Sequence, residues 1–114
     1  MVDSLYTHTK WSVQPGHAEA FIAAWSELAN AFLALPEFPI WGTLLRSDED
    51  PHLFYSFGPW RRVTDIEAMR AHPVVLVAYA HLHSLCLEMS PGAYQVVRHV
   101  ASPSDEPAAQ KKEQ

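Results

Sequence analysis

Three side chains in the second half of the chain could carry acid–base chemistry, namely His72, Tyr79 and His81. Histidine exchanges a proton near neutral pH, so His72 or His81 could remove a proton from a bound substrate. The phenol of Tyr79 could donate a hydrogen bond to the negative charge that then develops on oxygen. Together these residue types fit a reaction that starts with the ionisation of a small organic acid, phenol or enol.

Aromatic rings could wall a pocket beside these groups. Trp60 follows the Gly58-Pro59 pair at the end of a strand-like segment, and Phe21 and Trp25 share one face of a predicted helix. Large rings cover flat ligands well, but most buried tryptophans and phenylalanines only fill the core. Trp60, Phe21 and Trp25 could therefore be substrate-binding residues or ordinary core residues, and the sequence leaves both interpretations open.

Each of the three polar candidates also has an ordinary structural interpretation. His72 precedes Pro73, a residue favoured at the first position of a helix, so its imidazole could cap a helix end. His81 could be a solvated surface residue, and Tyr79 could pack its ring while its hydroxyl faces water.

The remaining candidates for metal binding or nucleophilic chemistry are weak. His81 and His83 are about 200° apart on a helix, whereas two ligands on one face need a spacing of three or four. His8 and His99 could face each other across two strands but have no further ligand assigned. Cys86 lies beside a core stripe and is interpreted as an inert packed thiol. We therefore expect no metal site, and no phosphate loop or dinucleotide fingerprint indicates a bound cofactor.

Hydrophobic spacing predicts a defined order of elements. They are a strand over 5–13, a helix over 19–35, a strand over 40–47, a polar turn at 48–51, a strand from 53 to the Gly58-Pro59 pair, a helix over 64–72, a helix from 73 to 89 and a strand over 93–101.

Several boundaries rest on particular residues. Gly58-Pro59 is expected to stop the third strand, and Thr64 with Glu67 three residues later is typical of a capping box. Ser90-Pro91-Gly92 is expected to break the last helix before the fourth strand begins.

This order predicts an α+β fold of the ferredoxin-like, split βαβ type, with a four-stranded antiparallel sheet and helices on one face. The second and third strands have apolar residues on both faces, for example Leu44 and Leu45. Because helices can cover only one face, we expect a second copy of the chain to cover the other and form a homodimer.

Length and composition limit the classes of protein. With 114 residues the chain predicts one domain, over 1–101, followed by a tail over 102–114 whose composition is typical of disorder. A net charge of −5 argues against a nucleic-acid partner. No apolar run reaches the ~18 residues of a membrane span, no signal peptide is visible, and one cysteine fits a reducing compartment. A cytoplasmic protein without membrane contact is expected.

Four segments carry a resemblance to a known family: PGHAEAFIAAW, GTLLRSDEDPHLFYSFGPW, AMRAHP and PGAYQVVRHV. In order and spacing they resemble the antibiotic biosynthesis monooxygenase superfamily of dimeric α+β barrels, over about residues 5–100. The resemblance implies a homodimer with one pocket per subunit between helices and sheet. Its founding members oxygenate aromatic, polyketide-like substrates with molecular oxygen and use neither metal nor flavin. A haem-cleaving branch also keeps a tryptophan where Trp60 stands, but its strand asparagine and helix histidine fall on Thr9 and near Tyr79.

The sequence therefore predicts a cofactor-independent monooxygenase for a small aromatic or enolisable substrate. A dimeric ligand-binding or sensor domain without turnover is the alternative from another class, because pocket aromatics serve binding and catalysis equally. Haem binding is a third possibility.

Overall fold

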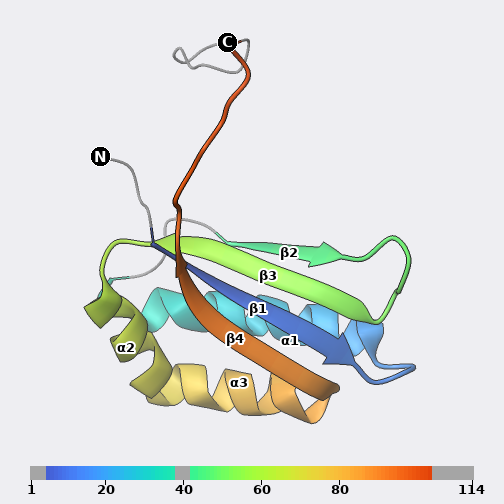
Figure 1. The fold of residues 1–114 in the computed structure, drawn as a ribbon. Coiled ribbons are helices and arrows are strands. Elements are labelled where there is room, and N and C mark those ends of the chain that lie inside the picture. The colour runs from blue at the N-terminus through green and yellow to red at the C-terminus, as the bar shows by residue number, and fades with distance from the viewer. Residues whose placement is uncertain (1–4, 38–41, 104–114) are drawn as a thin grey trace.

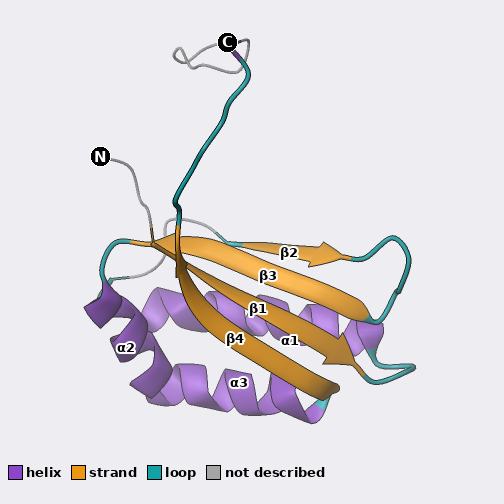
Figure 2. Ribbon diagram, in the orientation of Figure 1, coloured by secondary structure: helices purple, strands orange, loops and turns teal. Residues whose placement is uncertain are grey.

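The computed structural model, which describes residues 5–37 and 42–103, contains a four-stranded antiparallel sheet with helices on one face (Figures 1 and 2). The elements are β1 (Leu5–Val13), α1 (Ala18–Ala31), the short 3-10 helix η1 (Phe32–Ala34), β2 (Thr43–Arg46), β3 (Leu53–Trp60), α2 (Val63–Ala71), α3 (Pro73–Ser84) and β4 (Cys86–Gln95). The strand order β2-β3-β1-β4 puts β1 and β3 in the centre. The predicted ferredoxin-like α+β fold is confirmed.

Alternation along the central strands separates the two faces of the sheet. Thr9, Trp11 and Val13 point toward the helices and are buried. In the antiparallel register Thr9 lies opposite Ser56 and Trp11 opposite Phe54, so Ser56 and Phe54 share this helix-covered face. The intervening residues lie on the face away from the helices, which we call the outer face. From β1 and β3 it carries Tyr6, His8, Lys10, Ser12, Leu53, Tyr55 and Phe57.

The core lies between the sheet and α1 and α3. The predicted stripe of α1 is confirmed at Phe21 and Leu28, which are buried, while Trp25 is only partly buried. Phe21 packs between two rings of the sheet, with ring centroids 5.3 Å from Trp11 and 4.8 Å from Phe54. This aromatic centre fixes the distance between α1 and the sheet.

The predicted helix pair is present, but two of its details differ from expectation. The predicted Thr64–Glu67 capping box is wrong, because the N-cap residue of α2 is Arg62 and no side chain caps that end. Arg62 instead pairs with the nearly buried Asp65, with nitrogen–oxygen distances of 3.2 and 3.3 Å. The last helix ends at Ser84 and not at 89.

Two proline-containing segments that were expected to end elements lie inside strands. β3 continues through Gly58-Pro59 to Trp60. Among the described residues its pairing with β2 ends at Phe57 and β1 is the neighbour that pairs with Pro59, and proline is tolerated in a strand paired on one side. β4 runs over Cys86–Gln95, so the fourth strand is present but the predicted bounds of 93–101 are wrong and overlap it only at 93–95. β4 pairs with β1 alone and is an edge strand, and an edge can accept Pro91.

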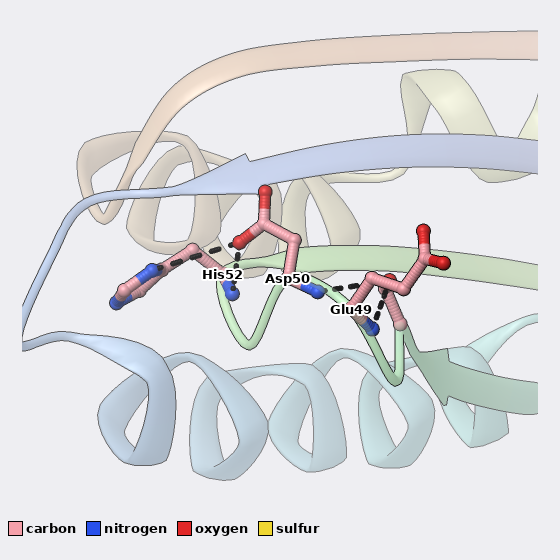
Figure 3. Close-up of polar contacts among 4 residues, drawn as sticks. Glu49, Asp50 and His52 are labelled. Atoms are coloured by element: carbon pink, nitrogen blue, oxygen red, sulfur yellow. Dashed lines mark hydrogen bonds and ion pairs between the residues drawn. The ribbon is translucent and has the colours of Figure 1, made fainter.

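The predicted polar turn between the second and third strands is confirmed. Figure 3 shows the contacts around Glu49, Asp50 and His52. The Ser47 hydroxyl accepts hydrogen bonds from the backbone N–H groups of Glu49 and Asp50, both at 3.1 Å, and the Asp50 carboxylate accepts from the His52 N–H at 2.9 Å. These side-chain bonds hold the hairpin that sets the register of β2 on β3.

Some sequence predictions fall wholly or partly outside the described residues. Ile40 and Trp41 of the predicted second strand are among these, as is most of the predicted tail, whose disorder stays a prediction. Residues 96–103 are described, and they extend away from the sheet (Figure 1) with Val97 and Val100 exposed. Within the described ranges, no helix is long and apolar enough to cross a membrane.

Candidate functional site

A pocket of about 210 Å³ opens between the helix-covered face of the sheet and the C-terminal part of α1. Its floor comes from β1 and β3, its roof from α1 and η1, and one wall from α3. The lining residues are Thr7, Thr9, Trp25, Leu28, Ala29, Phe32, Leu33, Gly42, Ser56, Phe57, Gly58, Trp60 and Tyr79. Two of the three predicted binding residues, Trp60 and Trp25, therefore line one cavity together with Tyr79.

Four hydroxyl groups interrupt this otherwise apolar lining. Thr7, Thr9 and Ser56 stand on the floor, and Tyr79 stands on the α3 wall. The hydroxyls of Thr9 and Tyr79 make no hydrogen bond to any other described residue, although Thr9 is 5% exposed. Unsatisfied buried hydroxyls are costly, so this arrangement favours a ligand that supplies oxygen or nitrogen acceptors.

Two tryptophans hold two of the three floor hydroxyls, those of Thr7 and Ser56. Trp60 Nε1 donates a hydrogen bond to Thr7 Oγ1 at 2.9 Å, and Trp11 Nε1 donates to Ser56 Oγ at 2.9 Å. Both bonds join β1 to β3 diagonally across the register. The Trp60 ring also meets Phe32 edge to face, with centroids 5.8 Å apart, and so links floor and roof.

Tyr79 remains protonated in this environment. Burial raises the pKa of the Tyr79 phenol above its usual value, and the positive charge of Arg70 opposes this only in part. The phenol is therefore a hydrogen-bond donor throughout the neutral range and would lose that role only as the pH rises through the elevated pKa. Tyr79 thus offers a hydrogen-bond donor to the pocket, and its role as donor to a developing oxyanion stays a prediction.

The two predicted bases do not line the pocket. His72 lies at the junction of α2 and α3, where its Nδ1 accepts a hydrogen bond from the Val74 N–H at 3.3 Å and caps α3. His81 is exposed on α3, and its Nδ1 lies 3.4 Å from the Glu27 carboxylate on α1. Neither histidine therefore lines the pocket with Trp60 and Tyr79, and their proposed role as bases stays a prediction.

Substitution of His72 distinguishes its role as a helix cap from its predicted role as a base. His72→Ala removes the cap and is expected to lower the free energy of unfolding by about 0.5–1 kcal/mol, whereas His72→Asn retains a good capping side chain. Neither variant has an imidazole, so a catalytic His72 would lose turnover in both. We expect the urea unfolding midpoint to fall in the alanine variant alone. Ligand binding should be equal in the wild type and in both variants.

The remaining candidates lie in the core or at the surface. Phe21, predicted as a pocket wall, is fully buried between Trp11 and Phe54 and does not line the cavity. Burial raises the pKa of the Cys86 thiol, as the interpretation of a packed thiol requires. No group of three His, Cys, Asp or Glu residues in the described part of the chain could hold a metal ion.

Sequence reasoning missed the floor hydroxyls as site residues. Thr7, Thr9 and Ser56 share a strand face with the buried apolar residues Trp11, Val13 and Phe54, so they are polar residues on the face that the helices cover. A hydroxyl on the core side of a central strand is the signal that could have identified them, because such groups need a partner.

These features define a ferredoxin-like α+β domain whose single sheet floors a small, hydroxyl-lined aromatic pocket. The sequence model described as antibiotic biosynthesis monooxygenase matches residues 4–80, which is most of the chain. The chain belongs to the antibiotic biosynthesis monooxygenase family. No protein with a curated description matches the chain.

Solved structures share the fold at low sequence identity. SnoaB from Streptomyces nogalater, described as a cofactor-independent oxygenase, is 18% identical with a TM-score of 0.78, over 89% of this chain and 100% of that chain. PA3566 from Pseudomonas aeruginosa is 21% identical with a TM-score of 0.70, over 86% and 98% of the two chains. A putative antibiotic biosynthesis monooxygenase from Nitrosomonas europaea is 19% identical with a TM-score of 0.70, over 82% and 99%.

Proposed function

We propose that this chain is a cofactor-independent monooxygenase that uses molecular oxygen to oxidise a small aromatic or enolisable compound. The observation that carries the proposal is the set of four hydroxyls in an otherwise aromatic and aliphatic pocket. Membership of the antibiotic biosynthesis monooxygenase family and the fold shared with SnoaB, a cofactor-independent oxygenase, support it.

The proposed reaction begins with ionisation of the substrate. Loss of a proton from a phenol or enol gives a delocalised carbanion, whose electrons reduce oxygen as a carbon–oxygen bond forms. Protonation of the peroxide and loss of water then leave a new carbonyl, so one oxygen atom enters the product and the other leaves as water. The described pocket lining contains donors and no basic side chain, so the proposal assigns the first proton to solvent and requires an acidic substrate.

The protein's contribution in this scheme is binding and charge stabilisation. Trp25, Phe32 and Trp60 exclude water and cover the faces of a planar ring system. Tyr79 and the floor hydroxyls donate hydrogen bonds to the oxygen on which negative charge develops. Such hydrogen bonds stabilise the charge more strongly in an apolar site than in water.

Oxygen consumption with a panel of hydroquinones and anthrones tests this function. If the panel contains a substrate, Tyr79→Phe should lower kcat/KM by about tenfold or more, the value of one hydrogen bond to a charged group. The ring and its stacking on Trp11 persist in that variant, so its melting temperature serves as the internal control. Equal turnover by the variant would remove Tyr79 from the mechanism.

A ligand-binding domain without turnover is the second candidate, and the lack of a basic side chain among the described lining residues favours it. Binding of several panel members at micromolar affinity without any oxygen consumption would make it the better assignment. Haem binding would require an axial ligand in the pocket, and among the described lining residues Tyr79 is of a type that can ligate haem iron. A Soret band in the purified protein would reveal bound haem.

We also propose that the protein acts as a homodimer through the outer face. No helix of the described residues covers this face (Figure 1), and it exposes Leu45 and Tyr94. A hollow of about 430 Å³ on it is lined by Tyr6, His8, Phe57, Tyr94, Gln95 and Val96. A second copy that covered this face would bury on the order of 2,000 Å² in total.

Leu45→Asp should raise the dimer dissociation constant at least about tenfold, because the partner would have to desolvate an unpaired carboxylate. Leu76→Asp is the matched control, since Leu76 is also a leucine with an exposed fraction of 50%, as Leu45 is, but lies on α3 in the helical layer. Sedimentation of both variants across micromolar concentrations measures the difference. A monomeric wild-type protein in the same experiment would contradict the proposal.

A further inference from the structure

Trp11 is a buried residue that does not line the pocket but supports two groups that do. Its exposed fraction is 1%, and its Nε1 donates the 2.9 Å hydrogen bond to Ser56 Oγ. Its ring also stacks on Tyr79, with centroids 6.3 Å apart and an interplanar angle of 19°. One side chain of the core therefore contacts a hydroxyl residue of the floor and the hydroxyl residue of the wall.

The direction of the hydrogen bond determines what Ser56 can offer to a ligand. An indole N–H can only donate, whereas a serine hydroxyl has one donor hydrogen and two acceptor lone pairs. Because Trp11 occupies a lone pair of Ser56, the hydroxyl hydrogen must point away from the indole. No described residue accepts that hydrogen, and Ser56 lines the pocket, so the hydrogen is available to a bound ligand.

We propose that Trp11 is a positioning residue that fixes Ser56 as a hydrogen-bond donor to the pocket. As a result the pocket discriminates between the charge states of its ligand, and the bond adds preference for a phenolate or enolate over the neutral hydroxyl form. This inference deepens the proposed function of the same pocket, but it concerns binding and does not require turnover. It also explains why a tryptophan, and not a simple hydrocarbon ring, stands at this point of the core.

The test measures the affinity of the pocket for the two forms of one probe. Chromogenic phenols such as 4-nitrophenol and hydroxyanthraquinones report their own ionisation by absorbance, so a titration at several pH values gives the ratio of anion to neutral affinity. Trp11→Phe keeps an aromatic ring against Phe21 and removes the N–H group. We expect this variant to lower the anion-to-neutral ratio by about tenfold, as loss of a donor to a charged oxygen would.

Trp25→Phe is the matched control. Trp25 lines the pocket, but its indole makes no hydrogen bond to another described residue. Its replacement should change the affinity for both forms of the probe by a similar factor and leave the ratio as in the wild type.

A double-mutant cycle separates positioning from packing. Ser56→Ala should lower the ratio as much as Trp11→Phe does, because one removes the Ser56 hydroxyl and the other removes the bond that orients it. The combined variant should show no further fall, since both substitutions abolish the same fixed donor to the ligand. A merely structural Trp11 would lower the melting temperature and leave the ratio unchanged, which would overturn the proposal. Additive losses in the double variant would also overturn it.

Two further outcomes have defined meanings. If Trp11→Phe does not fold, Ser56→Ala alone must lower the ratio about tenfold, and an unchanged ratio overturns the proposal. Failure of the wild-type protein to bind any probe overturns it as well. If the expected ratios are found while no panel member consumes oxygen, the monooxygenase function fails and the positioning role of Trp11 is supported.

Discussion

Phe21→Ala is expected to lower the free energy of unfolding by about 3–5 kcal/mol, a large part of the stability of a domain of this size. Phe21 is fully buried, and its ring touches Trp11 and Phe54 at the centre of the layer between α1 and the sheet. Truncation would leave a cavity that the surrounding rings cannot close without shifting α1. Urea unfolding followed by tryptophan fluorescence measures the change in midpoint.

Phe32→Ala provides the contrast for this prediction. Phe32 also lies on the helical layer, but it is only partly buried and lines the pocket against Trp60. Its truncation should cost clearly less stability than that of Phe21 and should weaken ligand binding more. If Phe21→Ala impaired binding while its unfolding midpoint stayed unchanged, Phe21 would be a pocket wall, as the sequence alone left possible.

Gly58→Val is expected to weaken ligand binding by about a hundredfold. Gly58 stands on the floor of the pocket in β3, between Ser56 and Trp60. A valine side chain there would project into the space that a ligand uses, and a clash of about 3 kcal/mol corresponds to about a hundredfold in affinity.

Gly42→Ala is the control for this variant, because Gly42 also lines the pocket. A Cβ atom at position 42 would lie 3.9 Å from the Trp25 ring and 4.0 Å from the Phe57 carbonyl oxygen, which are ordinary contacts. Isothermal titration with the best probe should therefore show near wild-type affinity for Gly42→Ala. Equal affinity of Gly58→Val would mean that ligands bind elsewhere on the protein.

Hydrophobic periodicity was sufficient to predict the fold. The two faces of β1 differ in polarity, and the apolar stripe of α1 differs from the rest of that helix. It failed where a local signal depends on the tertiary position of a strand. Gly58-Pro59 and Ser90-Pro91-Gly92 would interrupt a strand that is paired on both sides, but among the described strands each of these segments pairs with only one neighbour. The sequence does not say which strand is at the edge, so these two boundaries could not be read from it.

Only part of the candidate site could be predicted, because the rest also depends on tertiary structure. Trp60, Trp25 and Tyr79 were identified from their residue type and face, and all three line the pocket. The histidines were chosen for their chemistry, yet a residue at a helix junction or on the solvent side of a helix can meet other needs, as His72 and His81 do. Which side chains converge depends on the spacing of α1 and the sheet, and local sequence does not determine that spacing.

The position of Pro91 in β4 has a consequence for aggregation. An open sheet edge is a template on which a strand of another chain can grow, and a proline removes a backbone donor from that edge. On the opposite side of the sheet the edge strand β2 is only four residues long. Lateral addition of strands is thus hindered at both edges, so concentrated protein should resist fibril formation, and self-association is directed toward the broad faces of the sheet.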